Sequence, residues 1–218
     1  MVPAAALRDA DGQNGSDGRP PLRPVAERMV GRSHLWSGTY AETGDGAVFG
    51  GVMMSDSGAL SAVMELPPRA GSRPRTTPTN PHTQLDQQPQ DSGVRARLVA
   101  ALSRLPNTRW GPSAISVPGA EALFLEEDAG DGPADAFLIG REFAHLHPAP
   151  DFSLHAMLPP GLADILVERG WAEPHPVARM GLIPPNAVMI YAPRDDRERA
   201  LVEAVVTASH HYASGTTG

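Results

Sequence analysis

Apolar residues recur at helical spacing in three stretches of the chain. These stretches cover residues 93–105, 160–169 and 196–209, and Ser92 and Asp195 stand where the first and third would be capped. Prolines end the first and open the second, as expected at helix boundaries. The apolar positions are Val94, Leu98, Ala101, Leu102 and Leu105, then Leu162, Ile165 and Leu166, then Leu201, Val202, Val205 and Val206. The pattern predicts three helices.

Short apolar runs between these helices predict strands. They occur at residues 114–117, at residues 121–125, as a hairpin within residues 136–158, and at residues 187–191. The order of helix, several strands, helix, strand and helix is typical of an α+β fold. We therefore expect a single antiparallel-rich sheet that contains a histidine-bearing hairpin and is covered on one face by about three helices.

The N-terminal part of the chain has a different character. Residues 1–21 are rich in Gly, Asp and Pro with little to bury, which predicts a disordered tail. Residues 22–92 predict an irregular extension that packs on the core, with a proline-rich stretch at residues 67–90 that resembles a linker in composition. The α+β core is then expected to occupy residues 93–215.

The predicted hairpin concentrates the polar chemistry. Alternation along its first strand puts one set of residues on one face, namely Arg141, Phe143, His145 and His147, and leaves Glu142, Ala144 and Leu146 on the other. Matching apolar with apolar residues across the hairpin pairs Leu146 with Leu154 and Ala144 with Ala156. This register predicts that His145 lies opposite His155.

Three interpretations of the histidines remain open on the motif alone. His145, His147 and His155 together have ligand-like placement for Zn, Fe or Mn. The same imidazoles could perform acid–base chemistry on a phenol or enol, because they titrate near neutral pH. They could also form a hydrogen-bonded polar cluster in a partly covered sheet. His-x-His by itself does not decide between these interpretations.

Composition narrows the chemistry that the chain can perform. The chain of 218 residues has no cysteine, and all 18 of its basic residues are arginine. Thiol nucleophiles, thiolate metal sites, Schiff bases and P-loop lysines are therefore excluded. A net charge of −7 argues against a nucleic-acid or anionic-membrane partner. The N-terminal residues do not have the pattern of a secretory signal, so we expect a cytoplasmic location.

Other residues stand where they could contribute to a site. His175 follows the second predicted helix in a turn, and Tyr191 and Arg194 follow the strand at residues 187–191. These two could orient an anionic substrate. Arg69 and Arg73 lie in the proline-rich stretch, where composition alone favours solvated charges.

Several short motifs occur in a recognisable order and spacing over roughly residues 60–213. They are Leu66-Pro-Pro-Arg69-Ala-Gly71-Ser-Arg73-Pro74, Thr83-Gln84-Leu85, Arg141-Glu142-Phe-Ala-His145-Leu-His147, Ser153-Leu-His155, Gly170-Trp171, His175-Pro176 and Tyr191-Ala-Pro-Arg194. In these motifs the chain resembles the fungal luciferase family, which also has bacterial members. The resemblance implies that residues 67–90 are an ordered part of the fold.

The resemblance also implies an activity. Members of this family oxygenate a hydroxylated styryl-type α-pyrone with O2 and no organic cofactor, and a peroxide then loses CO2 to leave an excited product. O2 reacts poorly with closed-shell organic molecules until the substrate becomes an electron-rich anion. A histidine base together with arginines could generate and hold such an anion.

We therefore expect a cofactor-independent, luciferase-like oxygenase for an enolisable hydroxylated pyrone or polyphenol. The expected partners are that small molecule and O2, without nucleic acid or membrane. The expected catalytic residues are His145, His147, His155, Arg141 and Glu142, and the expected substrate-binding residues are His175, Tyr191, Arg194, Arg69 and Arg73. The alternatives are an oxygenase with a divalent metal on the three hairpin histidines, and a non-catalytic protein that binds small molecules.

Overall fold

The sheet is the central element of the computed structural model, which describes residues 66–216. In this part of the chain six strands form one sheet in the order β1-β2-β3-β4-β6-β5, and each neighbouring pair is antiparallel. The strands are β1 (Thr108–Pro112), β2 (Glu121–Leu125), β3 (Glu142–Leu146), β4 (Leu154–Met157), β5 (Ala172–Pro174) and β6 (Ala187–Ile190). The predicted α+β fold with one antiparallel sheet is confirmed.

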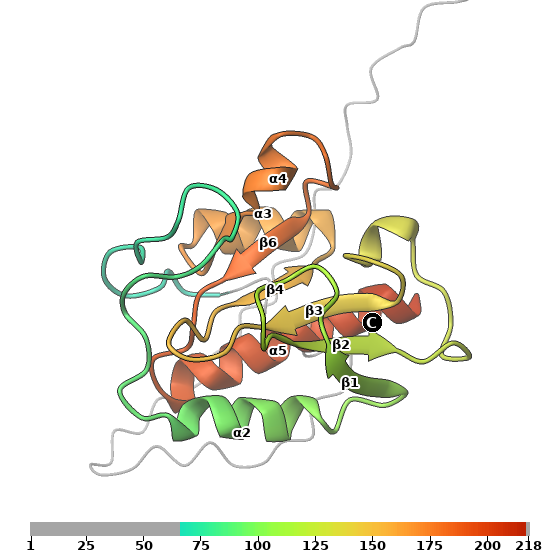
Figure 1. Cartoon of the computed structure of the whole chain (residues 1–218), viewed down its shortest axis with the longest axis horizontal. Coiled ribbons are helices and arrows are strands. Elements are labelled where there is room, and N and C mark those ends of the chain that lie inside the picture. The colour runs from blue at the N-terminus through green and yellow to red at the C-terminus, as the bar shows by residue number, and fades with distance from the viewer. Residues whose placement is uncertain (1–65, 217–218) are drawn as a thin grey trace, which may run out of the picture. The chain divides into compact units, whose positions relative to one another are not determined.

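Three longer helices accompany the sheet. They are α2 (Gly93–Leu102), α3 (Pro160–Glu168) and α5 (Asp196–Ser214), and the short helices α4 (Pro176–Arg179) and η1 (Ala134–Ala136) lie in connections. Helix α5 contacts β2, β3 and β4, α2 packs on α5, and α3 packs near β5 (Figure 1). Within residues 66–216, no helix has the length and apolar character needed to cross a membrane.

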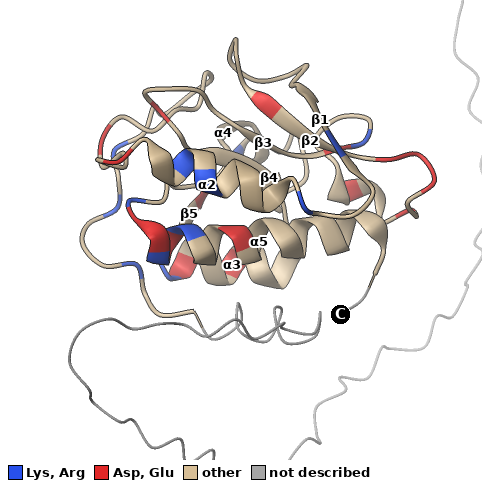
Figure 2. Cartoon of the chain, turned by 90° about the horizontal axis from the view of Figure 1, so that it is seen from below, with Lys and Arg blue, Asp and Glu red and all other residues tan. Residues whose placement is uncertain are grey.

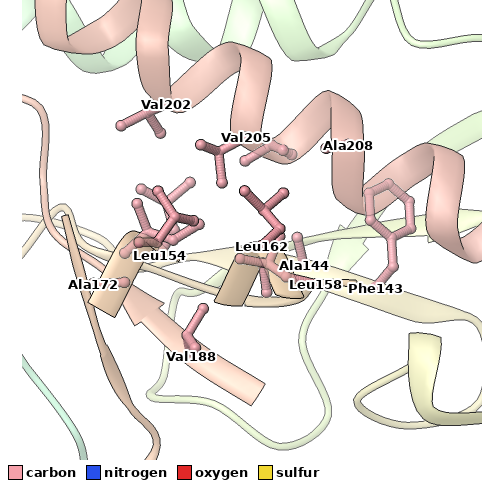
Figure 3. Close-up of a cluster of buried hydrophobic side chains, with 14 of the residues drawn as sticks. Phe143, Ala144, Leu154, Leu158, Leu162, Ala172, Val188, Val202, Val205 and Ala208 are labelled. Carbon is pink, nitrogen blue, oxygen red and sulfur yellow. The ribbon is translucent and has the colours of Figure 1, made fainter. Parts of the chain in front are cut away.

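The core lies between the helices and one face of the sheet. Figure 3 shows side chains of α5 and α3 directed toward strand residues such as Ala144, Leu154 and Val188. Leu98 and Leu102 of α2 extend this core, and both side chains are buried. Each fully buried aliphatic side chain contributes about 1.5–3 kcal/mol. This packing leaves the opposite face of the strands free to carry polar residues.

The start of α5 combines capping with surface charge. The Asp195 side chain accepts a hydrogen bond from the Glu198 backbone nitrogen at 2.8 Å, as the capping-box spacing predicts. Arginine positions on α2 and charged positions near the start of α5 lie close together (Figure 2), and Arg97 donates to Asp196 at 2.8 Å. The N-terminal end of α5 is thereby joined to α2.

The predicted register of the hairpin is confirmed. Strands β3 and β4 pair Ala144 with Ala156 and Leu146 with Leu154, so His145 stands opposite His155. Burying apolar residues against the helices therefore places both histidines on the other face.

A β-bulge changes the predicted facing of two residues at the start of β3. On β2, Leu123 pairs with Ala144, whereas Phe124 pairs with Glu142, so Phe143 has no direct partner. The extra residue reverses the alternation at this point. Phe143 belongs to the buried apolar core, and Glu142 turns toward the histidine face, where it hydrogen-bonds His145. The prediction that Phe143 shares a face with the histidines and Glu142 does not is wrong.

Two edge regions also differ from expectation. Residues 114–117 form a loop, and the strand that pairs with β2 is β1, whose sequence Thr-Arg-Trp-Gly-Pro lacks an apolar alternation. Strand β5 was not expected because it is short and ends at Pro174. Both are edge strands, where pairing on one side alone tolerates glycine and proline.

Residues 66–92, named here the N-terminal strap, run along the β5 side of the sheet without regular secondary structure. A backbone hydrogen bond from Arg69 to Arg169 attaches the strap to the end of α3, and an isolated bridge between Thr76 and Gln84 pairs two parts of the strap with each other. The predicted tail at residues 1–21 and the extension up to residue 65 lie outside the described residues. The proposed division into tail, extension and core stays a prediction.

Candidate active site

A cavity of about 640 Å³ borders the histidine face of the sheet. Five histidines form its polar end, namely His82, His145, His147, His155 and His175. Its other walls are mostly apolar, with Ile115, Val117, Pro118, Phe137, Leu138, Met157, Val177, Ile183 and Pro184 among the lining residues. Its size and its mixture of apolar walls with a few convergent polar groups are typical of a small-molecule site.

The histidines converge from separate elements onto His155. His145 lies on β3, His155 on β4, His82 in the N-terminal strap, and His175 between β5 and α4. The ring centroid of His155 lies 4.9 Å from His145, 4.8 Å from His147, 4.7 Å from His175 and 5.3 Å from His82. The hairpin, the strap and the β5–α4 connection thus build one cluster.

Each of three histidines has a carboxylate partner. His145 Nδ1 lies 2.7 Å from Glu142 Oε1, and His82 Nε2 lies 2.6 Å from Glu173 Oε1. His147 Nδ1 hydrogen-bonds the Asp151 carboxylate. Because a carboxylate only accepts hydrogen bonds, each of these ring nitrogens is assigned the proton. The second nitrogen of each ring is then an acceptor in the neutral imidazole.

Asp151 is well placed to hold His147 in this tautomer. Its Oδ1 accepts from the backbone nitrogens of Gln84 at 3.0 Å and Ser153 at 3.2 Å. Burial by itself would raise the pKa of Asp151, but the hydrogen bonds from His147 and Ser153 outweigh it and lower that pKa. His147 Nε2 therefore carries a lone pair, and it is buried without a hydrogen-bond partner among the described residues.

His175 has the opposite tautomer. Its Nδ1 accepts a hydrogen bond from the Val177 backbone nitrogen at 3.1 Å, because His175 caps helix α4. The proton of the neutral ring then sits on Nε2. The cavity consequently combines an acceptor nitrogen on His147 with a donor nitrogen on His175.

Burial keeps the central histidines neutral near pH 7. It lowers the pKa of His145, which the hydrogen bond to Glu142 opposes, and it lowers the pKa of His175 to about 4. Burial, together with the neighbouring histidines, lowers the pKa of His155 well below 6.5. Neutral imidazoles can accept a proton or bind a metal.

These depressed pKa values predict a pH-dependent stability. Between about pH 6.5 and pH 4 the unfolded chain binds protons that the folded histidines do not, so the free energy of unfolding should fall as the pH is lowered. Replacing His175→Asn should make the fall shallower, because one group with a depressed pKa is removed. Urea denaturation at several pH values measures both slopes, and equal slopes would contradict the assignment.

Among the described residues, two groups of three histidines could hold a metal ion. One is the predicted set of His145, His147 and His155, and the other is His82, His155 and His175. In each group the candidate ligand atoms lie within 4.8 Å of one another. Both groups contain His155, which lies at the centre of the cluster.

The predicted residue Arg141 lies away from the cluster. It donates to Asp131 Oδ1 at 2.6 Å and to the carbonyl oxygens of Glu126 and Gly130 at 2.8 Å each. These contacts fasten the connection that leads to the 3-10 turn η1. Arg141 was expected to share the histidine face, but the bulge at Phe143 breaks the alternation on which that expectation rested.

The other predicted arginines also make internal contacts, and none is among the described residues that line the cavity. Arg69 and Arg194 both bond Glu198, and Arg73 donates to the carbonyl oxygens of Ala172 and Val167. The contacts of Arg69 join the strap to α5, and those of Arg73 join it to α3 and β5. The expected role of these three arginines in substrate binding stays a prediction.

Tyr191 supports the site from outside the cavity. Its hydroxyl donates to Glu173 Oε2 at 3.2 Å, and burial, with Glu173 nearby, raises the pKa of Tyr191 to about 12. The hydroxyl therefore stays protonated and orients the carboxylate that holds His82. Tyr191 is not among the described residues that line the cavity, and its expected role in substrate binding stays a prediction.

His82 is the site residue that the sequence interpretation missed. It lies in the proline-rich stretch, where no periodicity signals a function, next to the motif Thr83-Gln84-Leu85. Gln84 connects this region to the core, because its side chain accepts from the Ala192 backbone nitrogen at 2.8 Å. The motif next to His82 was the available signal.

The family model and the curated relatives that match this chain all carry the name luciferase. The sequence model of the Luciferase domain matches residues 140–209, which include the hairpin histidines. The chain is 33% identical over 162 residues to a luciferase of Armillaria gallica and, to the same extent, to one of Armillaria ostoyae, in each case covering 68% of this chain and 61% of the relative. A luciferase of Neonothopanus nambi is 36% identical over 74 residues, or 33% of this chain and 28% of the relative. No solved structure gives a significant match.

Proposed function

We propose, on the premise that residues 140–209 belong to the Luciferase domain family, that this protein is an oxygenase that adds O2 to a small enolisable substrate. The aligned part of the chain spans about 61% of the length of its Armillaria relatives, so the activity of those proteins is carried over here as a proposal. The substrate class is a hydroxylated pyrone or polyphenol. The observation that carries the proposal is the carboxylate-held His147, whose second ring nitrogen borders a largely apolar cavity and has no hydrogen-bond partner within residues 66–216.

The first step is removal of a proton from the substrate hydroxyl by His147 Nε2. Asp151 favours this step because its negative charge stabilises the imidazolium that forms. General base catalysis of this kind contributes about 10²–10⁴-fold to a rate. The product is an enolate or phenolate with enough electron density to react with O2.

The anion also needs hydrogen-bond donors. We assign this role to His175 Nε2–H together with protonated His147, rather than to the arginines expected from the sequence. Donors in a water-poor site stabilise developing charge more strongly than they do in water. The hydrophobic walls, among them Phe137 and Val177, then hold the rest of the substrate.

Oxygen addition follows from the anion without an organic cofactor. The electron pair of the enolate carbon forms a bond to one oxygen atom, and the other oxygen takes up the proton to give a hydroperoxide. Emission of light is proposed because the relatives are luciferases. Loss of CO2 from the peroxide of a pyrone is proposed from the family resemblance.

A metal-dependent oxygenase is the second candidate, and one observation favours it. Histidines that ligate metals commonly donate their other ring nitrogen to a carboxylate, as His145 and His147 do to Glu142 and Asp151. With His155 these residues would hold a divalent ion. Such an ion would supply Lewis-acid stabilisation of a substrate oxygen.

One experiment separates these functions. Purified protein is assayed for bound metal and then mixed aerobically with a hydroxylated styryl-pyrone such as 3-hydroxyhispidin, while oxygen uptake and light are recorded with and without a chelator. Chelator-insensitive oxygen uptake is expected. Uptake that disappears with the chelator favours the metal enzyme.

A non-catalytic function would give a different pattern. Tight binding of the pyrone without oxygen uptake would indicate a protein that recognises phenolic ligands. A panel of enolisable pyrones and catechols guards against a poor choice of substrate, because the proposed chemistry requires an acidic hydroxyl and no particular side chain. Absence of uptake across the panel would overturn the oxygenase proposal.

A further inference from the structure

A series of contacting side chains crosses the site from one carboxylate to another. In this chain of contacts, Glu142 is followed by His145, His155, His82 and Glu173. The four links measure 2.7 Å, 3.0 Å, 3.3 Å and 2.6 Å in that order. Every ring nitrogen of the three histidines takes part in one of these links.

This series of side chains has one proton fewer than it has links. An imidazole carries one N–H group in its neutral form, so three rings supply three protons to four links, and a fourth proton or a metal ion is needed to fill the last one. The carboxylates of Glu142 and Glu173 act as acceptors at both ends and supply no proton. One link therefore brings two lone pairs together unless an added proton or a metal ion lies between them.

The contacts with the two carboxylates determine which link lacks a proton. Glu142 takes the proton of His145 Nδ1, and Glu173 takes the proton of His82 Nε2, which leaves His145 Nε2 and His82 Nδ1 as acceptors. His155 has one proton and two neighbours. The shorter link, 3.0 Å to His145, is the one assigned the proton, so the lone pairs of His155 Nε2 and His82 Nδ1 face each other at 3.3 Å.

This separation suits two ligands of one metal ion. Zinc–nitrogen bonds of about 2.0–2.1 Å in tetrahedral geometry put two ligand nitrogens roughly 3.3–3.4 Å apart. The N–H group of His155 already donates to His145, and that of His82 donates to Glu173. Histidines that bind metals commonly donate their other ring nitrogen in this way. A cation between the two lone pairs would remove their repulsion and balance part of the charge of the two carboxylates.

We propose that His82 Nδ1 and His155 Nε2 bind a divalent transition-metal ion, with His175 as a weaker third ligand. His175 belongs to the same group of potential ligands, but its Nε2 could bind a metal only with the proton moved to Nδ1. That change would break the hydrogen bond from the Val177 backbone nitrogen. His82 and His155 therefore carry most of the affinity.

This site differs from the set expected from the sequence. Using His145 as a ligand through Nε2 would break its hydrogen bond with His155 Nδ1, whereas the pair proposed here keeps the three links to which a proton is assigned. His147 is not a ligand of this site. Metal binding therefore goes beyond the oxygenase proposal, and either can fail without the other.

Calorimetric titration of metal-stripped protein with Zn²⁺ tests the site. One equivalent is expected to bind, His82→Asn and His155→Asn should each weaken binding at least tenfold, and His175→Asn should weaken it less. His147→Asn should leave binding unchanged. Circular dichroism of each variant shows whether it is folded, and His82→Asn is decisive because His82 lies on the strap rather than in a strand.

Two results would overturn the proposal. The first is Zn²⁺ binding that depends on His147 but not on His82. The second is the absence of binding, with imidazole ¹⁵N NMR spectra at pH 7 in which the nitrogens of both His82 and His155 are protonated, so that a proton fills the link. Oxygen uptake by the same metal-stripped protein reports separately on the oxygenase.

Discussion

Replacing His147→Asn is expected to lower kcat for oxygen uptake by about 10²–10⁴-fold, the usual contribution of a general base. The Asp151 contact leaves His147 Nε2 with a lone pair, and no residue in the described part of the chain hydrogen-bonds to it. The asparagine amide can still donate to Asp151, so the buried carboxylate keeps a partner and the fold should be retained. KM should change little because the apolar walls stay in place. Oxygen-electrode kinetics and circular dichroism measure the two effects.

Two variants serve as comparisons for this result. Asp151→Asn should also lower kcat, because the preferred tautomer of His147 is lost. His211→Asn, which changes a histidine on α5 away from the cavity lining, should keep nearly full activity. Full activity of His147→Asn on a substrate that wild type oxygenates would remove His147 as the base.

Replacing Glu198→Leu is expected to lower the free energy of unfolding by about 3–5 kcal/mol, because it leaves a buried charge without its partner. Arg69 lies 3.1 Å from Glu198, and their side chains are only 3% and 8% exposed. The Arg69 guanidinium lies over the rings of Trp171 and Tyr191, at 5.8 Å and 5.4 Å from the centroids, and cannot easily reach water. Chemical denaturation measures the loss.

The double variant Arg69→Met with Glu198→Leu is the matched control. It removes both buried charges and should recover a large part of the lost stability. If the loss is below about 1 kcal/mol for the single variant, the ion pair is not a structural anchor. If Arg69→Met alone raises KM without a change in stability, the substrate-binding role expected from the sequence would be supported instead.

The sequence was sufficient to predict the register of the hairpin. Only one pairing matches Leu146 with Leu154 and Ala144 with Ala156, and a slip by one residue would move His155 into the apolar core. The three longer helices, α2, α3 and α5, were predictable for the same reason, because their apolar positions face a single core. A helix or strand with one clear apolar face can bury that face in few ways, so its orientation and register can be predicted from the sequence.

The remaining features depend on contacts that are distant in sequence. Nothing in the local pattern marks Phe143 as the extra residue of a bulge, since the bulge is defined by its pairing with β2. His82 reaches the cluster from an irregular strap, and its carboxylate partner Glu173 lies 91 residues away in sequence. The arginines were expected to bind an anion, but their nearest acceptors are carbonyl oxygens and carboxylates of the protein itself, such as Glu198.

The absorption spectrum of a bound pyrone under nitrogen tests the central proposal most directly. In the absence of O2 the reaction should stop at the anion that His147 generates. At a pH below the pKa of the free compound, wild-type protein is expected to show the spectrum of the deprotonated pyrone, and His147→Asn that of the neutral pyrone. Admission of air should then discharge the anion with uptake of O2. A neutral spectrum in wild-type protein, followed by normal oxygen uptake, would contradict catalysis through a substrate anion formed by His147.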